Sequence, residues 1–193
     1  MTTAAPTNSS TGPTLDHPTF QAVKKAFPNA KFKATEFRGQ GTLIVEPKDL
    51  HAVLSFLKKD GSTQYDFLTD VIGIDYLGYP TAMPGRFAVV YALTSLPKEA
   101  RFFVKTYLDP TLPTDGIAND PALVLDSACS LWAGAEWMER EVFDMFGIRF
   151  TNHPDLRRIL LWEEYPGHPL RKDYPVRGRG EREQYRVVDR TSA

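Results

Sequence analysis

Three β-rich runs follow one another along the middle of the chain, with only short loops between them. They cover residues 65–76, 86–94 and 101–108. The loops contain Gly-Tyr-Pro at 78–80 and Met-Pro-Gly at 83–85. Consecutive strands with such short connections pair antiparallel, because parallel neighbours need a crossover of about a dozen residues or more. The middle of the chain therefore predicts an antiparallel sheet.

The segment before these runs predicts a helix and a hairpin. Asp16 can cap a short helix that ends at Phe27, with a proline in its first turn. Residues 31–37 and 42–45 are predicted as two short strands around a Gly-Gln-Gly turn at 39–41.

A second helix is predicted over residues 47–59, because its leucines and valine recur on one stripe. The resulting order of helix, two strands, helix and three strands is an α+β pattern. We therefore expect a two-layer fold in which helices pack on a mostly antiparallel sheet, followed by an extended C-terminal arm.

The composition of the chain changes after this region. Residues 123–146 are predicted to be helical, in two pieces broken near Gly134. Beyond residue 150 the prolines prevent long helices. We therefore divide the chain into an N-terminal tail without regular structure (1–14), an α+β domain (15–150) and an extended interaction arm (151–193).

Charge and cysteine content exclude several classes of protein. The 23 basic and 24 acidic residues give a net charge of −1, which argues against a dedicated nucleic-acid binder. No uncharged apolar stretch reaches the roughly 20 residues of a membrane span, and residues 1–14 lack the features of a secretory signal, so we expect a cytoplasmic chain. Cys129 is the single cysteine, which excludes an intrachain disulfide and a four-thiolate metal site. We expect it to be a buried core thiol, with a Cys–His nucleophile as the alternative.

Acidic and basic residues alternate along the predicted helix at 136–146. Glu136 can pair with Arg140, and Arg140 with Asp144, at i,i+4, each pair contributing about 0.3–0.5 kcal/mol. Apolar burial contributes more, so packing is expected to hold the helix. Glu139 and Glu141 lie two residues apart and diverge on a helix, so they do not form a shared acid–base site.

Two His-Pro dipeptides, at His153 and His168, are each followed by basic residues. A metal site would need further ligands from Asp155, Glu163 or Asp173, but the spacing matches no known ligand motif. An anion site would use four cations. These are Arg157, Arg158, Arg171 and Lys172. No glycine-rich phosphate loop accompanies them, and we favour an interaction with acidic groups on a neighbouring protein.

Three stretches of the sequence resemble the signature of one known family. They are Glu-Arg-Glu-Val-Phe-Asp-Met-Phe-Gly-Ile at 139–148, His-Pro-Asp-Leu-Arg-Arg-Ile-Leu at 153–160 and Gly-His-Pro-Leu-Arg-Lys-Asp-Tyr-Pro at 167–175. The family is the C-type subunit of NADH-quinone oxidoreductase, the thirty-kilodalton-type subunit of respiratory complex I. Weaker similarity at 70–76 and 86–91 extends the resemblance over most of the domain.

The resemblance implies a structural subunit in the peripheral arm of a proton-translocating NADH:quinone oxidoreductase, on the cytoplasmic side of the inner membrane. It implies no catalytic residue, no metal and no cofactor in this chain, with FMN and iron–sulfur clusters in partner subunits. The expected partners are the D-type (forty-nine-kilodalton) subunit, with the B-type and I-type subunits nearby, in a hetero-oligomer. Because the chain ends 18 residues after Pro175, we expect a form that is not fused to the forty-nine-kilodalton subunit.

The resemblance also points to the residues of a partner interface. They are Glu139, Arg140, Glu141, Asp144, His153, Asp155, Arg157, Arg158, His168, Arg171, Lys172 and Asp173. Two alternatives stay open. The same module occurs in membrane-bound hydrogenases and in ferredoxin- or deazaflavin-linked dehydrogenases, and the four cations could serve a free-standing anion-binding enzyme.

Overall fold

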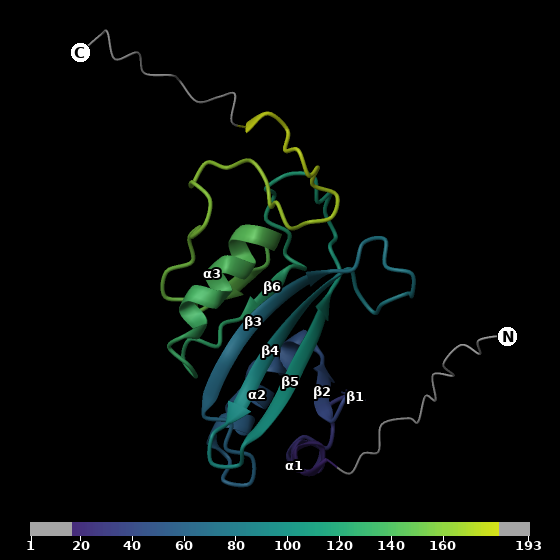
Figure 1. Cartoon of the computed structure of the whole chain (residues 1–193), viewed down its shortest axis with the longest axis vertical. Coiled ribbons are helices and arrows are strands. Elements are labelled where there is room, and N and C mark those ends of the chain that lie inside the picture. Colours follow the sequence, from purple (N-terminus) through teal and green to yellow (C-terminus); the bar gives the residue numbers. More distant parts are fainter. Residues whose placement is uncertain (1–16, 182–193) are drawn as a thin grey trace, which may run out of the picture.

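Five strands form the main sheet of the chain, of which the computed structural model describes residues 17–181. The order across the sheet is β1-β2-β5-β4-β3 (Figure 1). The strands are β1 (Phe32–Phe37), β2 (Gln40–Val45), β3 (Phe67–Asp75), β4 (Phe87–Ser95) and β5 (Ala100–Leu108). All neighbours pair antiparallel except β2 and β5, which are parallel, as their long connection permits. The predicted α+β class and the mostly antiparallel sheet are confirmed.

The two N-terminal helices form where the sequence predicts them. Helix α1 (Pro18–Ala26) begins after His17, whose Nδ1 accepts a hydrogen bond from the backbone N–H of Thr19. The predicted cap, Asp16, lies outside the described residues, and the capping position belongs to His17. A single 3₁₀ turn (Pro47–Asp49) precedes helix α2 (Leu50–Lys59).

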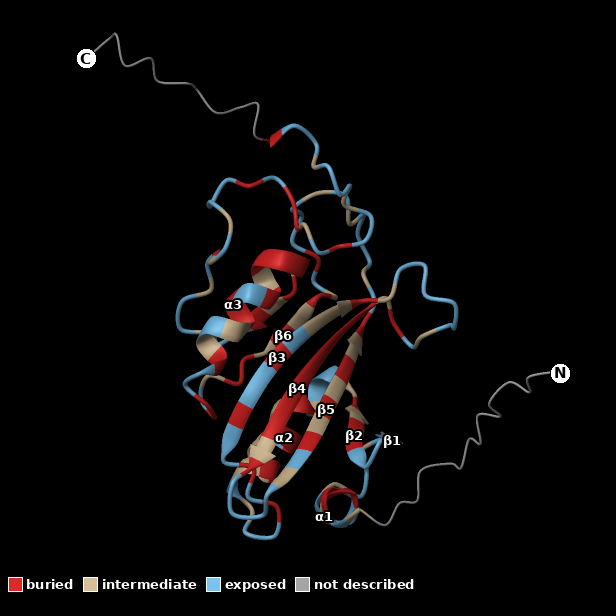
Figure 2. Ribbon diagram, in the orientation of Figure 1, coloured by how far each residue is buried: buried red, intermediate tan, exposed pale blue. Residues whose placement is uncertain are grey.

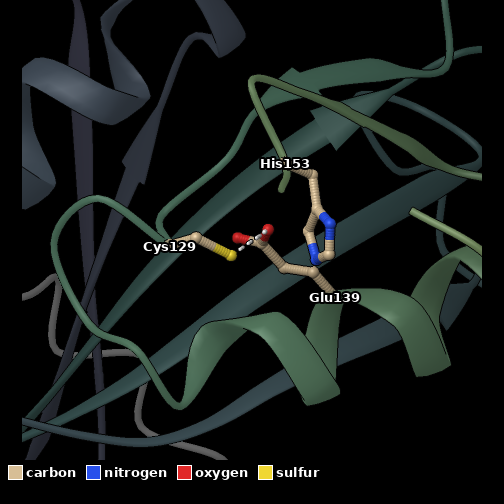
Figure 3. A group of neighbouring side chains, drawn as sticks. All are labelled: Cys129, Glu139 and His153. Carbon is tan, nitrogen blue, oxygen red and sulfur yellow. Dashed lines mark hydrogen bonds between the residues drawn. The ribbon is translucent and has the colours of Figure 1, made fainter. Parts of the chain in front are cut away.

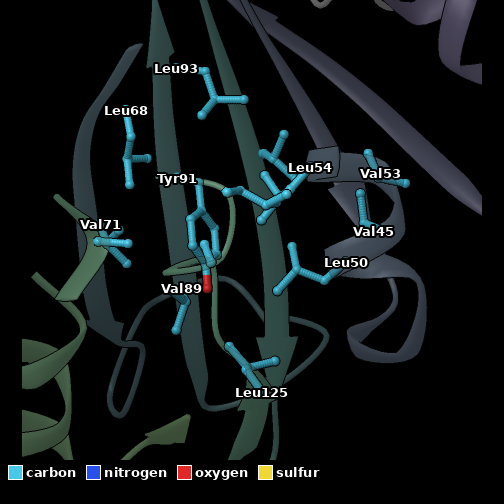
Figure 4. Packing of buried hydrophobic residues seen from close by; sticks show 14 of the residues in the cluster. Val45, Leu50, Val53, Leu54, Leu68, Val71, Val89, Tyr91, Leu93 and Leu125 are labelled. Carbon is cyan, nitrogen blue, oxygen red and sulfur yellow. The ribbon is translucent and has the colours of Figure 1, made fainter. Parts of the chain in front are cut away.

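The main core lies between the helices and one face of the sheet. Figure 4 shows Tyr91 and Val89 of β4 pointing toward Leu50 and Leu54 of α2, all four of them fully buried. Strand β4 is buried along almost its whole length, whereas β3 is exposed at several positions (Figure 2). Full burial of each such side chain contributes roughly 1.5–3 kcal/mol, so this layer supplies most of the folding free energy.

Helix α3 (Ala135–Phe146) packs on the same face, beside β3. A Cβ at Gly73 of β3 would lie only 2.5 Å from the Phe146 ring, so the close approach of strand and helix requires glycine there. The helix ends at Gly147, which adopts the left-handed conformation (φ 72°) and donates its N–H to the carbonyl of Phe143.

The prediction of a helix over residues 123–134 is wrong. Residues Val124–Asp126 form a short strand, β6, which pairs parallel with β7 (Arg149–Thr151), and α3 is the crossover between them. The helix starts only at Ala135, after a series of turns. Periodicity alone cannot tell a short apolar strand from a helical segment, and this explains the error.

The C-terminal segment, defined here as residues 152–181, has almost no regular secondary structure. It folds back over the end of α3 and the nearby ends of the sheet (Figure 1). Leu170 donates its N–H to the carbonyl of Met145, and Lys172 donates its N–H to the Asp75 carboxylate at 2.8 Å. The expected extended arm is not confirmed for these residues. The domain boundary at residue 150 stays a prediction, and the predicted tail (1–14) and residues 182–193 lie outside the described part.

Candidate docking surface over a buried charge cluster

The carboxylate of Asp144, on the last turn of α3, fixes the start of the C-terminal segment. It is fully buried and accepts hydrogen bonds from the backbone N–H groups of Ile159, Leu160 and Leu161 and from the Arg158 guanidinium at 2.6 Å. Burial opposes ionisation of Asp144, but these hydrogen bonds outweigh it and lower the pKa of the carboxyl group. Asp144 therefore acts as an ionised anchor for three consecutive backbone amides.

Arg158 is the buried counter-ion of Asp144 and also binds the backbone of its own segment. Its guanidinium donates to the carbonyls of Tyr165 (2.8 Å) and Gly167 (3.1 Å). A guanidinium has five N–H donors in a fixed planar arrangement, whereas a lysine ammonium has three, so an arginine can bond a carboxylate and several carbonyls at once. Arg158 thus satisfies carbonyls that no helix or strand pairs.

His168 and Arg171 attach the following turn to the C-terminal end of α3. His168 Nδ1 lies 2.8 Å from the Asp144 carbonyl, and Arg171 Nε donates to the Phe146 carbonyl at 2.7 Å. Burial, with a contribution from the nearby arginines, lowers the pKa of His168 to about 4. The ring is therefore neutral at physiological pH. Both side chains approach Gly147 so closely that a Cβ there would collide with them.

An ion-pair network connects the segment to the sheet. Asp75, at the end of β3, accepts two hydrogen bonds from Arg86, and Arg86 also lies 2.9 Å from the Asp173 carboxylate. Burial opposes ionisation of Asp75, but the bonds from Arg86, Lys172 and Leu77 outweigh it and lower its pKa. Asp75 and Arg86 lie in the stretches of weaker similarity, although neither was predicted as a site residue.

Asp120 is a further buried carboxylate that the sequence analysis missed. It accepts hydrogen bonds from Thr111, Leu112 and Ala122, which overcome burial and lower its pKa to about 2. The loop that it stabilises offers the carbonyl of Thr114 to Arg171 at 2.9 Å. An aspartate in a loop often bonds the backbone N–H two residues further on, as Asp120 does with Ala122. This tendency is the only sign of its role that the sequence offers.

Cys129, Glu139 and His153 come together beside α3 (Figure 3). Their possible ligand atoms lie within 4.8 Å of one another, the one such group among residues 17–181. Glu139 is fully buried and accepts from the Ser127 hydroxyl at 2.6 Å and the Ala128 N–H at 2.7 Å. Burial raises the pKa of Glu139, and it raises that of Cys129 to about 11.

The hydrogen bonds of His153 bear on whether this group fits a metal ion. Its Nδ1 accepts from the Asp155 N–H at 3.1 Å, so the neutral ring carries its proton on Nε2, 3.1 Å from the Glu136 carbonyl. In this arrangement neither ring nitrogen offers a lone pair to a metal. The geometry favours a hydrogen-bonded group that holds the turn at 127–129 onto α3.

The i,i+4 pairs expected on α3 are not formed. Arg140 instead donates to the carbonyls of Arg157 (3.1 Å) and Arg158 (2.9 Å), and Asp144 binds Arg158. Arg140 binds these carbonyls rather than a side chain on a neighbouring turn of α3. They have no partner in a helix or strand, and leaving a buried carbonyl without a hydrogen bond would destabilise the fold. The expectation that apolar burial holds α3 agrees with its buried Val142, Met145 and Phe146.

The residues predicted for a partner interface fall into two groups. Six are buried and have partners within the chain, namely Glu139, Arg140, Asp144, Arg158, His168 and Arg171. Five are exposed or partly exposed, namely Glu141, Asp155, Arg157, Lys172 and Asp173, and His153 is half-buried. The interface itself stays a prediction. Arg158 and Arg171 are not available for the hypothetical anion site, because both guanidinium groups already donate hydrogen bonds to acceptors within the chain.

The fold and this cluster define a class: an α+β domain whose irregular C-terminal segment is fixed by buried charged side chains. Residues 43–180 match the family described as the 30 Kd subunit of respiratory-chain NADH dehydrogenase, and the chain belongs to this family. Among similar proteins are two named as the C subunit of NADH-quinone oxidoreductase. One is from Citrifermentans bemidjiense (44% identical, covering 85% of this chain and 91% of that one) and the other from Trichlorobacter lovleyi (44%, covering 87% and 96%).

Solved structures show the same fold. A trypsin-resistant fragment (1–134) of Nqo5 is 32% identical, with a TM-score of 0.58, and the match covers 72% of this chain and 99% of the fragment. An archaeal membrane-bound sulfane sulfur reductase contains a chain with a TM-score of 0.63 at 19% identity, which is a likeness of fold alone. Within residues 17–181, every helix is too short or too polar to cross a bilayer.

Proposed function

We propose that this chain is a structural, cofactor-free subunit of the peripheral arm of a proton-translocating NADH:quinone oxidoreductase. It would lie on the cytoplasmic side of the membrane and support the subunits that carry electrons from NADH to quinone. The forty-nine-kilodalton-type subunit would be its main neighbour, with the B-type and I-type subunits nearby. FMN and iron–sulfur clusters would belong to those other subunits. Family membership supports this assignment.

The observation that carries the proposal is the way the C-terminal segment uses its charged groups. Its inward-facing arginines and histidine bind groups of this chain, as the contacts of Arg158, His168 and Arg171 show. A segment without regular structure is thereby held in one conformation. Such preorganisation favours protein binding, because less conformational entropy is lost when the partner docks.

The outward side of the same segment has the composition of a docking surface. Leu160, Leu170 and Val176 are exposed in this segment, which also carries the exposed charged residues Arg157 and Lys172. Exposed leucine and valine side chains gain free energy when a partner covers them, and a rim of charged residues gives specificity. We therefore assign docking to the exposed residues of the predicted interface, and structural support to the buried ones.

Co-purification of a tagged chain from gently solubilised membranes tests this function. We expect flavin- and cluster-bearing subunits and membrane subunits to co-purify, together with NADH:quinone oxidoreductase activity. Recovery of hydrogenase subunits in their place would move the chain to a related complex. A chain recovered alone would contradict the proposal.

An exposed arginine separates docking from folding. Arg157→Ala changes a side chain that pairs with Asp155 at the surface, so its free energy of unfolding should change by less than about 0.5 kcal/mol while subunit recovery falls. Lys59→Ala, on the exposed end of α2, is the matched control and should change neither quantity. Normal recovery with Arg157→Ala would remove this residue from the interface.

A further inference from the structure

The sheet has a second face that no helix within residues 17–181 covers. Side chains alternate between the faces of a strand, and Val89 and Tyr91 point toward α2, so Val90 points to the other side. Strand pairing extends this position into a row across all five strands. The row is Lys33, Ile44, Lys105, Val90 and Ile72. It combines three aliphatic side chains with two lysines.

A loop turns part of this face into a groove. Residues 81–84 stand beside β1, β2 and β5. With Phe103, Tyr107 and the exposed Phe37 they line an open hollow of about 770 Å³. None of the residues that line this groove belongs to the C-terminal segment. The groove is thus separate from the docking surface proposed above.

The lysines in the groove lack acidic partners among the described residues. The ammonium group of Lys105 lies 4.7 Å from the ring centres of Tyr76 and Tyr107 and donates a hydrogen bond to the Tyr76 hydroxyl. No carboxylate within residues 17–181 lies within 4.0 Å of Lys105 or Lys33. A half-buried ammonium group flanked by aromatic rings is a favourable site for a carboxylate that arrives with its own apolar neighbours.

We infer that this groove binds an apolar segment carrying an aspartate or glutamate from another subunit of the same complex. The carboxylate pairs with Lys105 or Lys33, and the flanking apolar side chains cover Ile44, Phe103 and the exposed Phe37. The inference rests on the proposed function, since it requires a complex that contains other subunits.

Photo-cross-linking in the assembled complex tests the occupant. The tagged full-length chain, with p-benzoylphenylalanine at position 37, is purified from membranes and irradiated, and the adducts are identified by mass spectrometry. We expect an adduct to another subunit, at a segment that contains an acidic residue among apolar ones. The same group at position 96, at the exposed tip of the β4–β5 hairpin, is the control and should give no such adduct.

Charge reversal tests the chemistry of recognition. Lys33→Glu combined with Lys105→Gln should reduce the adduct yield about tenfold or more, while Lys59→Glu should leave it unchanged. Thermal unfolding of each purified variant shows whether the domain is still folded. If the variant is unfolded, Lys33→Glu alone, at an exposed position, replaces it.

The outcomes separate this inference from the proposed function. An intact complex with no adduct at position 37, or with an adduct to a second copy of this chain, overturns the groove assignment and leaves the proposed function standing. A wild-type chain that brings no other subunit with it overturns the proposed function instead.

Discussion

The sheet layer and the C-terminal segment are stabilised by opposite means. In the sheet layer, leucine, valine and aromatic side chains are buried together and the backbone is paired by strand hydrogen bonds. In the C-terminal segment the backbone is irregular, and its carbonyl and N–H groups are paired with Asp144, Arg158, His168 and Arg171. One region depends on many small contributions and the other on a few large ones.

This difference determines how each region should respond to mutation. Truncating one buried leucine or valine in the sheet layer lowers the free energy of unfolding of a cooperative unit, which still unfolds as a whole. Removing one charged group from the cluster leaves its partner buried and unpaired, and a segment with few apolar contacts can then detach by itself. The predictions below test whether the two regions are separate in this sense.

The largest effect is expected from Asp144→Ala. The change leaves the Arg158 guanidinium and three backbone amides without their acceptor, which should cost about 3–5 kcal/mol. We expect the loss to be local. Hydrogen exchange should show amides of the C-terminal segment becoming unprotected while those of β4 stay protected.

Glu141→Ala is the matched control for this substitution. Glu141 lies on the same helix but is exposed, so its removal should change the free energy of unfolding by less than about 0.5 kcal/mol. If Asp144→Ala exposed β4 and the segment in a single step, the two regions would form one cooperative unit and the contrast between them would be wrong.

Leu54→Ala should produce the opposite pattern at a slightly smaller cost. Leu54 is fully buried against the sheet (Figure 4), and its truncation should cost about 3 kcal/mol through lost burial and the cavity left behind. Chemical denaturation followed by far-UV circular dichroism should show one transition at lower denaturant concentration. Loss of protection confined to the C-terminal segment would contradict this prediction.

The pH dependence of stability should come partly from the cluster. Because the folded-state pKa of His168 is about 4 and its unfolded value is about 6.5, the unfolded chain binds more protons between these values. The contribution of His168 is complete above pH 6.5 and is lost as the pH falls toward 4. We expect the free energy of unfolding to fall by about 1–2 kcal/mol between pH 6.5 and 5.

His168→Asn should remove that pH dependence. An asparagine amide can still donate to the Asp144 carbonyl, but it does not titrate. Denaturation curves at pH 7, 6 and 5 would measure the effect. An unchanged slope in the variant would show that another group is responsible. Asp144 affects a lower pH range. Because folding lowers the pKa of its carboxyl group, its stabilising contribution is complete above the unfolded pKa of about 3.8 and is lost as the pH falls below it.

The sheet layer was largely predictable from the sequence, and the cluster was not. Alternating apolar residues and short Gly/Pro loops locate β3, β4 and β5, because strand pattern is a local property. The parallel pairing of β2 with β5 is a long-range choice that local pattern does not reveal.

In the cluster, the pattern of charged residues predicted solvent-exposed side chains, but several of these side chains are buried. A run such as Glu139-Arg140-Glu141 is typical of a solvated helix face. Glu139 is nevertheless buried against the turn at 127–129, and Arg140 is buried against the C-terminal segment. The backbone path of the C-terminal segment determines which of its charged side chains are buried. That path is irregular, so no repeating sequence pattern predicts it. Resemblance to a family located these residues but could not sort the buried from the exposed.

The smallest effect is expected from Cys129→Ser, at the junction of the sheet layer and α3. The thiol donates weakly to Glu139 at 3.6 Å, and its pKa of about 11 keeps it protonated. A serine hydroxyl can donate to the same carboxylate, so the gain in hydrogen bonding offsets the lost apolar volume. We expect a change in the free energy of unfolding below about 1 kcal/mol, unchanged co-purification of partners, and slow reaction of the native wild-type thiol with a disulfide reagent. Loss of NADH:quinone activity in a variant that is stable and still co-purifies with its partners would contradict the purely structural role of this chain.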